Sequence, residues 1–187
     1  PIVAWIQQHP THMLVLHGKC GTGKTRGALV LAKHFGYHRA IINCSEQRNV
    51  SDFKHVLFTS STSKGFNQKR PLLILDELDG IHEDAVQYIC QFFKYTPAKQ
   101  MIPVVATCNE WHLPHLRSLR AYSTAINFHR IFVKDMMTLA RQLQPSWSTH
   151  KLKEYCIMSN GDLRQLKLLC GQKTTRTTKA DPHTSVF

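Results

Sequence analysis

The sequence predicts an α/β fold: a five-stranded parallel sheet with helices on both faces, followed by a partial small helical lid domain. Three observations carry this expectation. Short apolar segments of strand length alternate with amphipathic stretches of helical periodicity along most of the chain. The first apolar segment leads directly into a glycine-rich turn. After Pro145 the periodicity becomes purely helical.

The elements follow from these patterns in chain order. The expected strands are the apolar segments 12–16, 40–42, 72–75, 102–107 and 124–128. The third segment lacks alternating polar residues, so we expect it to be buried on both faces. Helices are expected at 24–35, where Gly36 supplies the stop, from Ser51 through Leu57, and at 83–95, with Ala85, Ile89 and Phe92 facing inward.

The periodicity also predicts how the chain is divided. Residues 1–131 are expected to form the α/β domain, and residues 132–171 a helical lid with helices at 148–158 and 162–170. Residues 172–187, in which basic residues lie among threonines, are expected to be a disordered tail. Because the sequence begins with Pro1 rather than Met, we expect a fragment or a processed product.

Composition limits the class of protein. With 42% hydrophobic residues in 187, the chain can bury a core, and no apolar run reaches membrane-spanning length. The 24 basic against 12 acidic residues give a net charge of +12, which favours a polyanionic partner, most commonly nucleic acid. The six scattered cysteines contain no C-x-x-C pair and predict free thiols in a reducing, intracellular compartment.

Residues 18–25, Gly-Lys-Cys-Gly-Thr-Gly-Lys-Thr, match the P-loop pattern G-x-x-x-x-G-K-[ST]. The glycines let the backbone curl so that successive N–H groups point at phosphate oxygens, and the following helix adds its dipole. We expect Lys24 to neutralise the β- and γ-phosphates of ATP and the Thr25 hydroxyl to ligate Mg²⁺. The expected phosphate-binding residues are Gly18, Lys19, Cys20, Gly21, Thr22, Gly23 and Lys24.

Residues 72–77, Leu-Leu-Ile-Leu-Asp-Glu, form a Walker B element, in which an apolar strand carries two carboxylates to its C-terminal end. We expect Asp76 to hold Mg²⁺ and Glu77 to polarise the attacking water. The interval between Lys24 and Asp76 has room for two helices and two strands, so both motifs can reach the same edge of the sheet.

Two further residues complete the predicted site. Asn109 follows the fourth apolar segment, where it could hydrogen-bond the γ-phosphate or the attacking water. It comes third along the chain after the P-loop and the Walker B acids, and is therefore interpreted as sensor 1. Arg164 opens the last helix, whose inner stripe is Leu163, Leu166 and Cys170, so it points elsewhere and could reach the γ-phosphate across a lid cleft as sensor 2.

These four motifs in this order resemble AAA+ ATPases, and finer details resemble the clamp-loader family, above all the large subunit of replication factor C. Asn43 to Arg48 is similar to the family segment N-A-S-D-x-R, and Asp76 to Gly80 to D-E-V-D-G. Residues 108–130 follow the stretch after sensor 1, and Asn160 to Gln165 resembles N-Q-D-[IL]-R-Q. The similarity covers about residues 3–170.

The resemblance implies an ATP- and Mg²⁺-dependent subunit of a hetero-oligomeric ring that opens a sliding clamp and grips primer–template DNA without sequence specificity. It implies a nuclear location if the source is eukaryotic; a viral or organellar source also fits. Basic residues that could follow the DNA backbone are Arg48, Lys64, Lys69 and Arg70.

The chain departs from the family in two places. Small clamp-loader subunits carry a Ser-Arg-Cys arginine finger after sensor 1, whereas this chain has Arg117-Ser118-Leu119-Arg120, as expected of a large subunit that receives a finger from its neighbour. After Gly80 the family has a glycine- and arginine-containing loop, and this chain has the acidic stretch 81–84. The family's adenine-pocket segment is expected upstream of Pro1, and its collar domain downstream.

Two alternatives stay open at this point. One is another AAA+ ATPase, such as an initiator or a helicase loader. The other is a nucleotide-gated scaffold subunit that binds ATP with little turnover.

Overall fold

The computed structural model describes residues 2–7, 11–46, 51, 54–55 and 70–171. The chain divides into two compact units, Pro1–Ile131 and Phe132–Phe187, and each is described by itself. The helix expected from Ser51 through Leu57, the basic residues Arg48, Lys64 and Lys69, and the tail after Gly171 fall wholly or mostly outside the described residues. No helix in the described part of the chain is long and apolar enough to cross a membrane.

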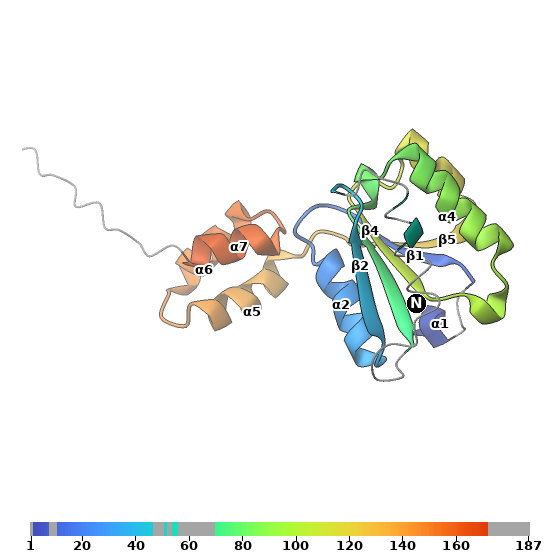
Figure 1. Cartoon of the computed structure of the whole chain (residues 1–187). Coiled ribbons are helices and arrows are strands. Elements are labelled where there is room, and N and C mark those ends of the chain that lie inside the picture. Colours follow the sequence, from blue (N-terminus) through green and yellow to red (C-terminus); the bar gives the residue numbers. More distant parts are fainter. Residues whose placement is uncertain (1, 8–10, 47–50, 52–53, 56–69, 172–187) are drawn as a thin grey trace, which may run out of the picture. The chain divides into compact units, whose positions relative to one another are not determined.

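The first unit is built on a five-stranded sheet in which every neighbouring pair of strands is parallel, as predicted (Figure 1). The strand order is β2-β3-β4-β1-β5. Parallel strands place all their C-terminal ends at one edge, where open α/β sheets bind ligands. The strands are β1 (Met13–His17), β2 (His38–Asn43), β3 (Pro71–Asp76), β4 (Val104–Cys108) and β5 (Ser123–Asn127).

Alternating side chains of the central strands enter two separate cores. Leu73 and Leu75 of β3 pack on one face, and Leu72 and Ile74 on the other, so the whole apolar run is buried, as predicted. The C-terminal end of β3 therefore lies between two packed layers that hold its backbone in place.

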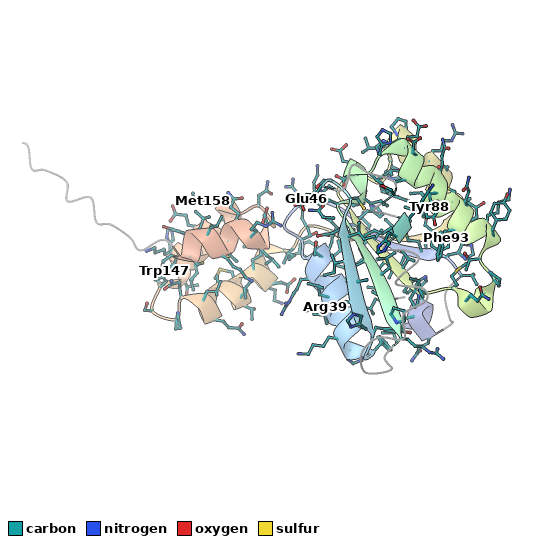
Figure 2. All side chains as sticks on the ribbon, viewed as in Figure 1. Arg39, Glu46, Tyr88, Phe93, Trp147 and Met158 are labelled. Carbon is teal, nitrogen blue, oxygen red and sulfur yellow. The ribbon has the colours of Figure 1, made fainter. Side chains whose placement is uncertain are left out.

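Helices cover both faces of this sheet (Figure 1). One face is covered by α4 (Glu83–Tyr95) and the 3₁₀ segment η3 (Pro114–Tyr122), and the other by α1 (Ile2–Gln7) and α2 (Lys24–His34). Figure 2 shows the side chains, Phe93 of α4 among them, that fill the space between α4 and the sheet. The inward stripe of α4 differs in one place from the prediction, because Phe93 is buried and Phe92 only partly so.

The second unit consists of α5 (Val133–Leu143), α6 (Thr149–Met158) and α7 (Leu163–Gly171). Two caps fix the starts of the last two helices. The Ser148 hydroxyl accepts from the backbone N–H of Lys151, and the Asp162 carboxylate accepts from those of Arg164 and Gln165. In the described part of the unit, the buried apolar side chains are Met136, Ala140, Leu152, Cys156, Leu166 and Cys170, and the buried polar side chain is Ser159.

Candidate nucleotide-binding site

The loop between β1 and α2 is held closely against the ends of neighbouring strands. The backbone N–H of Gly18 donates to the carbonyl of Cys108 at 3.1 Å, and that of Phe128 to the carbonyl of His17 at 2.6 Å. Gly18 has φ of 140°, and a Cβ there would collide with the Phe128 carbonyl oxygen. Only glycine fits this position, so the first glycine of the motif is required by the approach of the segment after β5 as well as by the turn.

Lys24, the first residue of α2, lies under this loop with 7% of its surface exposed. Its ammonium group donates to the carbonyls of Gly18 at 2.8 Å and Lys19 at 2.9 Å, and to Asn109 Oδ1 at 2.9 Å. Burial lowers the pKa of Lys24 from its ordinary value, and the nearby Asp79 and Asp76 carboxylates act in the opposite direction. The structure thus brings Lys24 and Asn109 together from positions 85 residues apart.

Thr25 and Asp76 meet at the same edge. The Thr25 hydroxyl donates to Asp76 Oδ1 at 2.8 Å, and the same oxygen accepts from the Thr107 hydroxyl. Thr107 also accepts from the backbone N–H of Glu77 at 3.2 Å. Thr107 was not predicted as a site residue; the parallel register, which pairs Leu75 with Ala106, puts it opposite Asp76.

The Glu77 side chain projects from a left-handed backbone position, with φ of 55° and ψ of 50°. Such a position is unusual for a residue with a Cβ and concentrates at functional sites. Glu77 Oε2 accepts from the Ser45 hydroxyl at 2.7 Å, and Ser45 is held in turn by Asn43, whose Oδ1 accepts from its backbone N–H at 3.2 Å. A Cβ at Gly80 would come within 2.9 Å of Ser45 Cβ, so this glycine lets the two loops approach. Ser45 was missed as a partner of Glu77.

Asn109 follows β4 and makes a second set of contacts with the turn after β3. Its backbone N–H donates to Asp79 Oδ1 at 3.1 Å, and its side-chain NH₂ donates to Asp79 Oδ2 at 3.3 Å. Asp79 belongs to the 3₁₀ turn η1 (Leu78–Gly80), whose Leu78 is fully buried. Asp79 lies in the motif Asp76 to Gly80, but no role was predicted for it from the sequence.

Arg164 belongs to the second unit and lies exposed on α7. The inner stripe of that helix is formed by the buried Leu166 and Cys170, with Leu163 partly exposed. Within this unit Arg164 faces away from the core, and its role as sensor 2 stays a prediction.

A pocket of about 630 Å³ opens beside the loop, at the ends of β4, β1 and β5. Its charged lining is mixed, with basic groups from the loop and from the segment after β5 and acidic groups from the turns after β3 and β4. Burial, together with His112, His129 and Lys24, lowers the pKa of His17, the last residue of β1. The lining residues are Gly18, Lys19, Cys20, Asp79, Asn109, Glu110, Asn127, Phe128, His129 and Arg130.

The donor set at the junction of α2 and β3 fits Mg²⁺. A threonine hydroxyl and a carboxylate are hard oxygen ligands, and Mg²⁺ is usually held by one or two such protein groups plus water and substrate phosphates. Thr25 and Asp76 already lie 2.8 Å apart, close enough to share one ion. Among the described residues, no group of three or more His, Cys, Asp or Glu side chains is arranged to hold a metal by itself.

The six cysteines are all free, as predicted. Cys20 on the loop is exposed, whereas Cys44 and Cys108 are buried beside the site. Burial, with the nearby carboxylates, raises the pKa of both buried thiols to about 12.

Comparison with known proteins identifies relatives of this chain. The replication factor C large subunit of Sulfolobus acidocaldarius is 34% identical over 144 residues, which cover 76% of this chain and 33% of that protein. Human replication factor C subunit 1 is 29% identical over 195 residues, covering 90% of this chain and 17% of that protein. The chain thus spans a third or less of the length of these relatives.

Among solved structures, the RuvB Holliday junction branch migration motor of Thermotoga maritima shares the fold, with a TM-score of 0.71 at 15% identity. The match covers 90% of this chain and 56% of that one. The model of the ATPase family associated with various cellular activities matches residues 14–130, which include every strand but the first residue of β1. This match takes in more than half of the chain, so the chain belongs to the AAA family of ATPases.

Proposed function

We propose that this chain is the ATP-binding and ATP-hydrolysing part of a clamp-loader subunit similar to the replication factor C large subunit. The observation that carries the proposal is a pair of hydrogen-bond networks at one sheet edge. One joins Lys24 to Asn109, and the other joins Thr25 and Thr107 to Asp76 and also engages the backbone of Glu77. These are the groups that phosphoryl transfer to water requires: a phosphate-binding lysine, metal ligands and a carboxylate to receive a proton.

In this proposal the amides of residues 18–23 and the Lys24 ammonium bind the triphosphate. Lys24 has three protons, each now donated to an oxygen of the protein, and phosphate oxygens are acceptors that can replace the Asn109 oxygen or a loop carbonyl. A buried ammonium needs such partners at every stage, so the lysine moves from one set of acceptors to another. Thr25 and Asp76 would hold Mg²⁺, which neutralises charge on the phosphates when bound.

Hydrolysis then forms a bond between the water oxygen and the γ-phosphorus and breaks the bond from that phosphorus to the oxygen that leaves with ADP. Glu77 receives the proton of the water. Its position is set from two sides, because Thr107 accepts from its backbone N–H and Ser45 donates to its carboxylate. A base held in this way can act without first searching for its orientation.

The finer assignment to a clamp loader is supported by the similarity of this chain to replication factor C large subunits of archaea and to human subunit 1. If the chain is part of a clamp loader, three further proposals follow.

Residues 132–171 form the lid that brings Arg164 to the γ-phosphate. A neighbouring subunit of the ring supplies an arginine. The complex acts on a sliding clamp and on primer–template DNA, in the nucleus if the source is eukaryotic. The net charge of +12 supports the DNA partner, and Arg70 is an exposed basic residue next to β3.

The test is single-turnover ATP hydrolysis by the full-length protein in its assembled complex, wild type against Glu77→Gln. Glutamine keeps the size and the contact with Ser45 but cannot take a proton, so we expect the rate to fall about 100-fold or more while MgATP still binds. Lys24→Ala should abolish binding itself. An unchanged rate in Glu77→Gln would favour the scaffold function, and unchanged MgATP binding in Lys24→Ala would refute the site.

A further inference from the structure

Both carboxylate oxygens of Asp79 accept hydrogen bonds from the same residue, Asn109. Oδ1 accepts the backbone N–H of Asn109 at 3.1 Å, and Oδ2 accepts the side-chain NH₂ at 3.3 Å. The turn that carries Asp79 is itself fixed. The N–H of Gly80 donates to the carbonyl of Glu77 at 2.9 Å, and Leu78 is anchored in the core. The carboxylate is therefore presented to Asn109 from a rigid support.

The contacts on the two sides of the Asn109 amide fix which way round it lies. An ammonium group only donates hydrogen bonds, and a carboxylate only accepts them. The amide oxygen must therefore face Lys24, at 2.9 Å, and the NH₂ must face Asp79. Turning the amide over would set its NH₂ against the ammonium and its oxygen against the carboxylate, which replaces two attractive contacts with two repulsive ones.

This orientation decides what Asn109 can offer to a bound nucleotide. One N–H of its NH₂ is donated to Asp79, and its oxygen, which accepts from Lys24, keeps a second lone pair on that side of the site. Phosphate oxygens are acceptors and cannot use that oxygen, whereas a water molecule has protons to donate to it. Of the two roles that the sequence left open for Asn109, a bond to the γ-phosphate or to the attacking water, the orientation favours the water.

We propose that Asp79 is a positioning residue that holds the Asn109 amide with its oxygen toward the nucleotide, so that Asn109 accepts a hydrogen bond from the attacking water. The inference rests on the proposed ATPase function. The water directs one O–H to Asn109 Oδ1 and loses its other proton to Glu77 as its oxygen bonds to the γ-phosphorus. Asn109 stays neutral throughout, and Asp79 touches neither water nor phosphate.

The test compares Asp79→Asn with Asp84→Asn in the full-length protein within its complex. Asparagine at position 79 keeps the shape but places an NH₂ group where one of the two accepting oxygens lies, so one of the two hydrogen bonds is lost. Asp84→Asn removes the same charge at an exposed site on α4, where Asp84 pairs only weakly with His82. We expect single-turnover hydrolysis to fall about 10- to 100-fold in Asp79→Asn, with ADP affinity within about threefold of wild type, because one charge-assisted hydrogen bond near the water is lost. Asp84→Asn should match the wild type.

A double-mutant cycle separates positioning from a general structural effect. If Asp79 acts through Asn109, then Asp79→Asn should slow hydrolysis in the wild type but cause no further loss in Asn109→Ala. An equal loss in both backgrounds, or a wild-type rate in Asp79→Asn, overturns the proposal. Melting curves and ADP binding check that each variant is folded.

A readout that needs no hydrolysis distinguishes this inference from the function on which it rests. In nucleotide-free protein, the side-chain NH₂ signals of Asn109, assigned by their loss in Asn109→Ala, should shift and exchange faster in Asp79→Asn but not in Asp84→Asn. Unmoved signals would show that Asp79 does not hold the Asn109 amide. If those signals move but the wild-type complex neither binds nor hydrolyses ATP, Asp79 still holds the amide, while the proposed function and the water-positioning role both fail.

Discussion

Thr107 shows how much of the site depends on a single buried side chain. It is 2% exposed, and its one hydroxyl both donates to Asp76 and accepts from the N–H of Glu77. Both acidic residues of the Walker B element are therefore tied to the neighbouring strand through the same oxygen. Groups that orient a metal ligand in this way strongly influence metal affinity even though they do not touch the metal.

We predict that Thr107→Val raises the Mg²⁺ concentration that half-saturates ATP hydrolysis by about tenfold, because Asp76 loses the hydroxyl that orients it. Valine has the shape of threonine without the hydroxyl, so the core should stay filled. Thr107→Ser keeps the hydroxyl and serves as the control, with an expected Mg²⁺ dependence close to the wild type. The measurement is ATPase rate against Mg²⁺ concentration at saturating ATP, and equal curves for Val and Ser would contradict the role of the hydroxyl.

The cysteines provide a chemical test of the same site. Only thiolates react quickly with maleimides, and burial raises the pKa of Cys44 and Cys108 to about 12, so at pH 7 both stay protonated and shielded. Cys20 is exposed on the P-loop. We expect maleimide to label Cys20 but neither buried thiol in the folded protein, as located by peptide mass spectrometry.

MgADP should protect Cys20 from labelling, because the proposed phosphate site lies along the loop that carries it. Cys20→Ser provides the blank. In Lys24→Ala, which cannot retain the nucleotide, Cys20 should be labelled to the same extent with MgADP as without it. Equal labelling of Cys20 with and without saturating MgADP would place the nucleotide elsewhere.

At the residue scale, the sequence could indicate Lys24, Thr25, Asp76, Glu77 and Asn109, because each lies at the end of a strand or the start of a helix in a recognisable pattern. It could not indicate that Thr107, Asp79 and Ser45 are their partners. Those pairings are made across strands and turns that lie 30 or more residues apart, and a shift of one residue in strand register would undo them. Single-sequence patterns contain no information on register.

Among the elements, the strands were the most predictable and the irregular helices the least. All five strands lie where the apolar runs indicated, within about two residues at each end, and α4 spans the predicted range. The 3₁₀ segment η3 was missed because its three-residue turn lacks a helical period, although Leu116 and Leu119 are buried. The helix α5 was missed, and its buried face has only Met136 and Ala140 to signal it.

The helices of the second unit depend on their caps, which gives a prediction at this scale. Ser148 caps α6, and replacing such a residue by alanine typically costs about 1 kcal/mol. We expect Ser148→Ala to lower the stability of this unit by that amount, and Ser148→Asp, which keeps an acceptor, to restore it. The measurement is chemical unfolding followed by the fluorescence of Trp147, which packs edge-on against Tyr155, with Trp5 and Trp111 of the first unit replaced by phenylalanine. Equal midpoints for the alanine and aspartate variants would argue against the cap.

For the whole molecule, the important property is that the cores of the two units are separate. The two clusters of buried side chains around the sheet contain only residues of the first unit, and the buried residues of α5, α6 and α7 pack among themselves within the described part of the chain. Apart from Arg164, the side chains of the candidate nucleotide site all belong to the first unit. A lid that works by moving requires this kind of independence.

We predict that Leu166→Ala and Leu73→Ala each loosen their own unit. Both residues are fully buried, and truncation to alanine at such a site costs about 2–5 kcal/mol. Hydrogen exchange by mass spectrometry should show faster exchange in α5–α7 and unchanged exchange in β1–β5 for Leu166→Ala, and the reverse for Leu73→Ala. Leu168→Ala, at an exposed position on α7, is the matched control and should change neither. If Leu166→Ala accelerates exchange in the central strands as much as in its own helices, the two units unfold as one cooperative body, and a lid that moves independently on this chain would have to be abandoned.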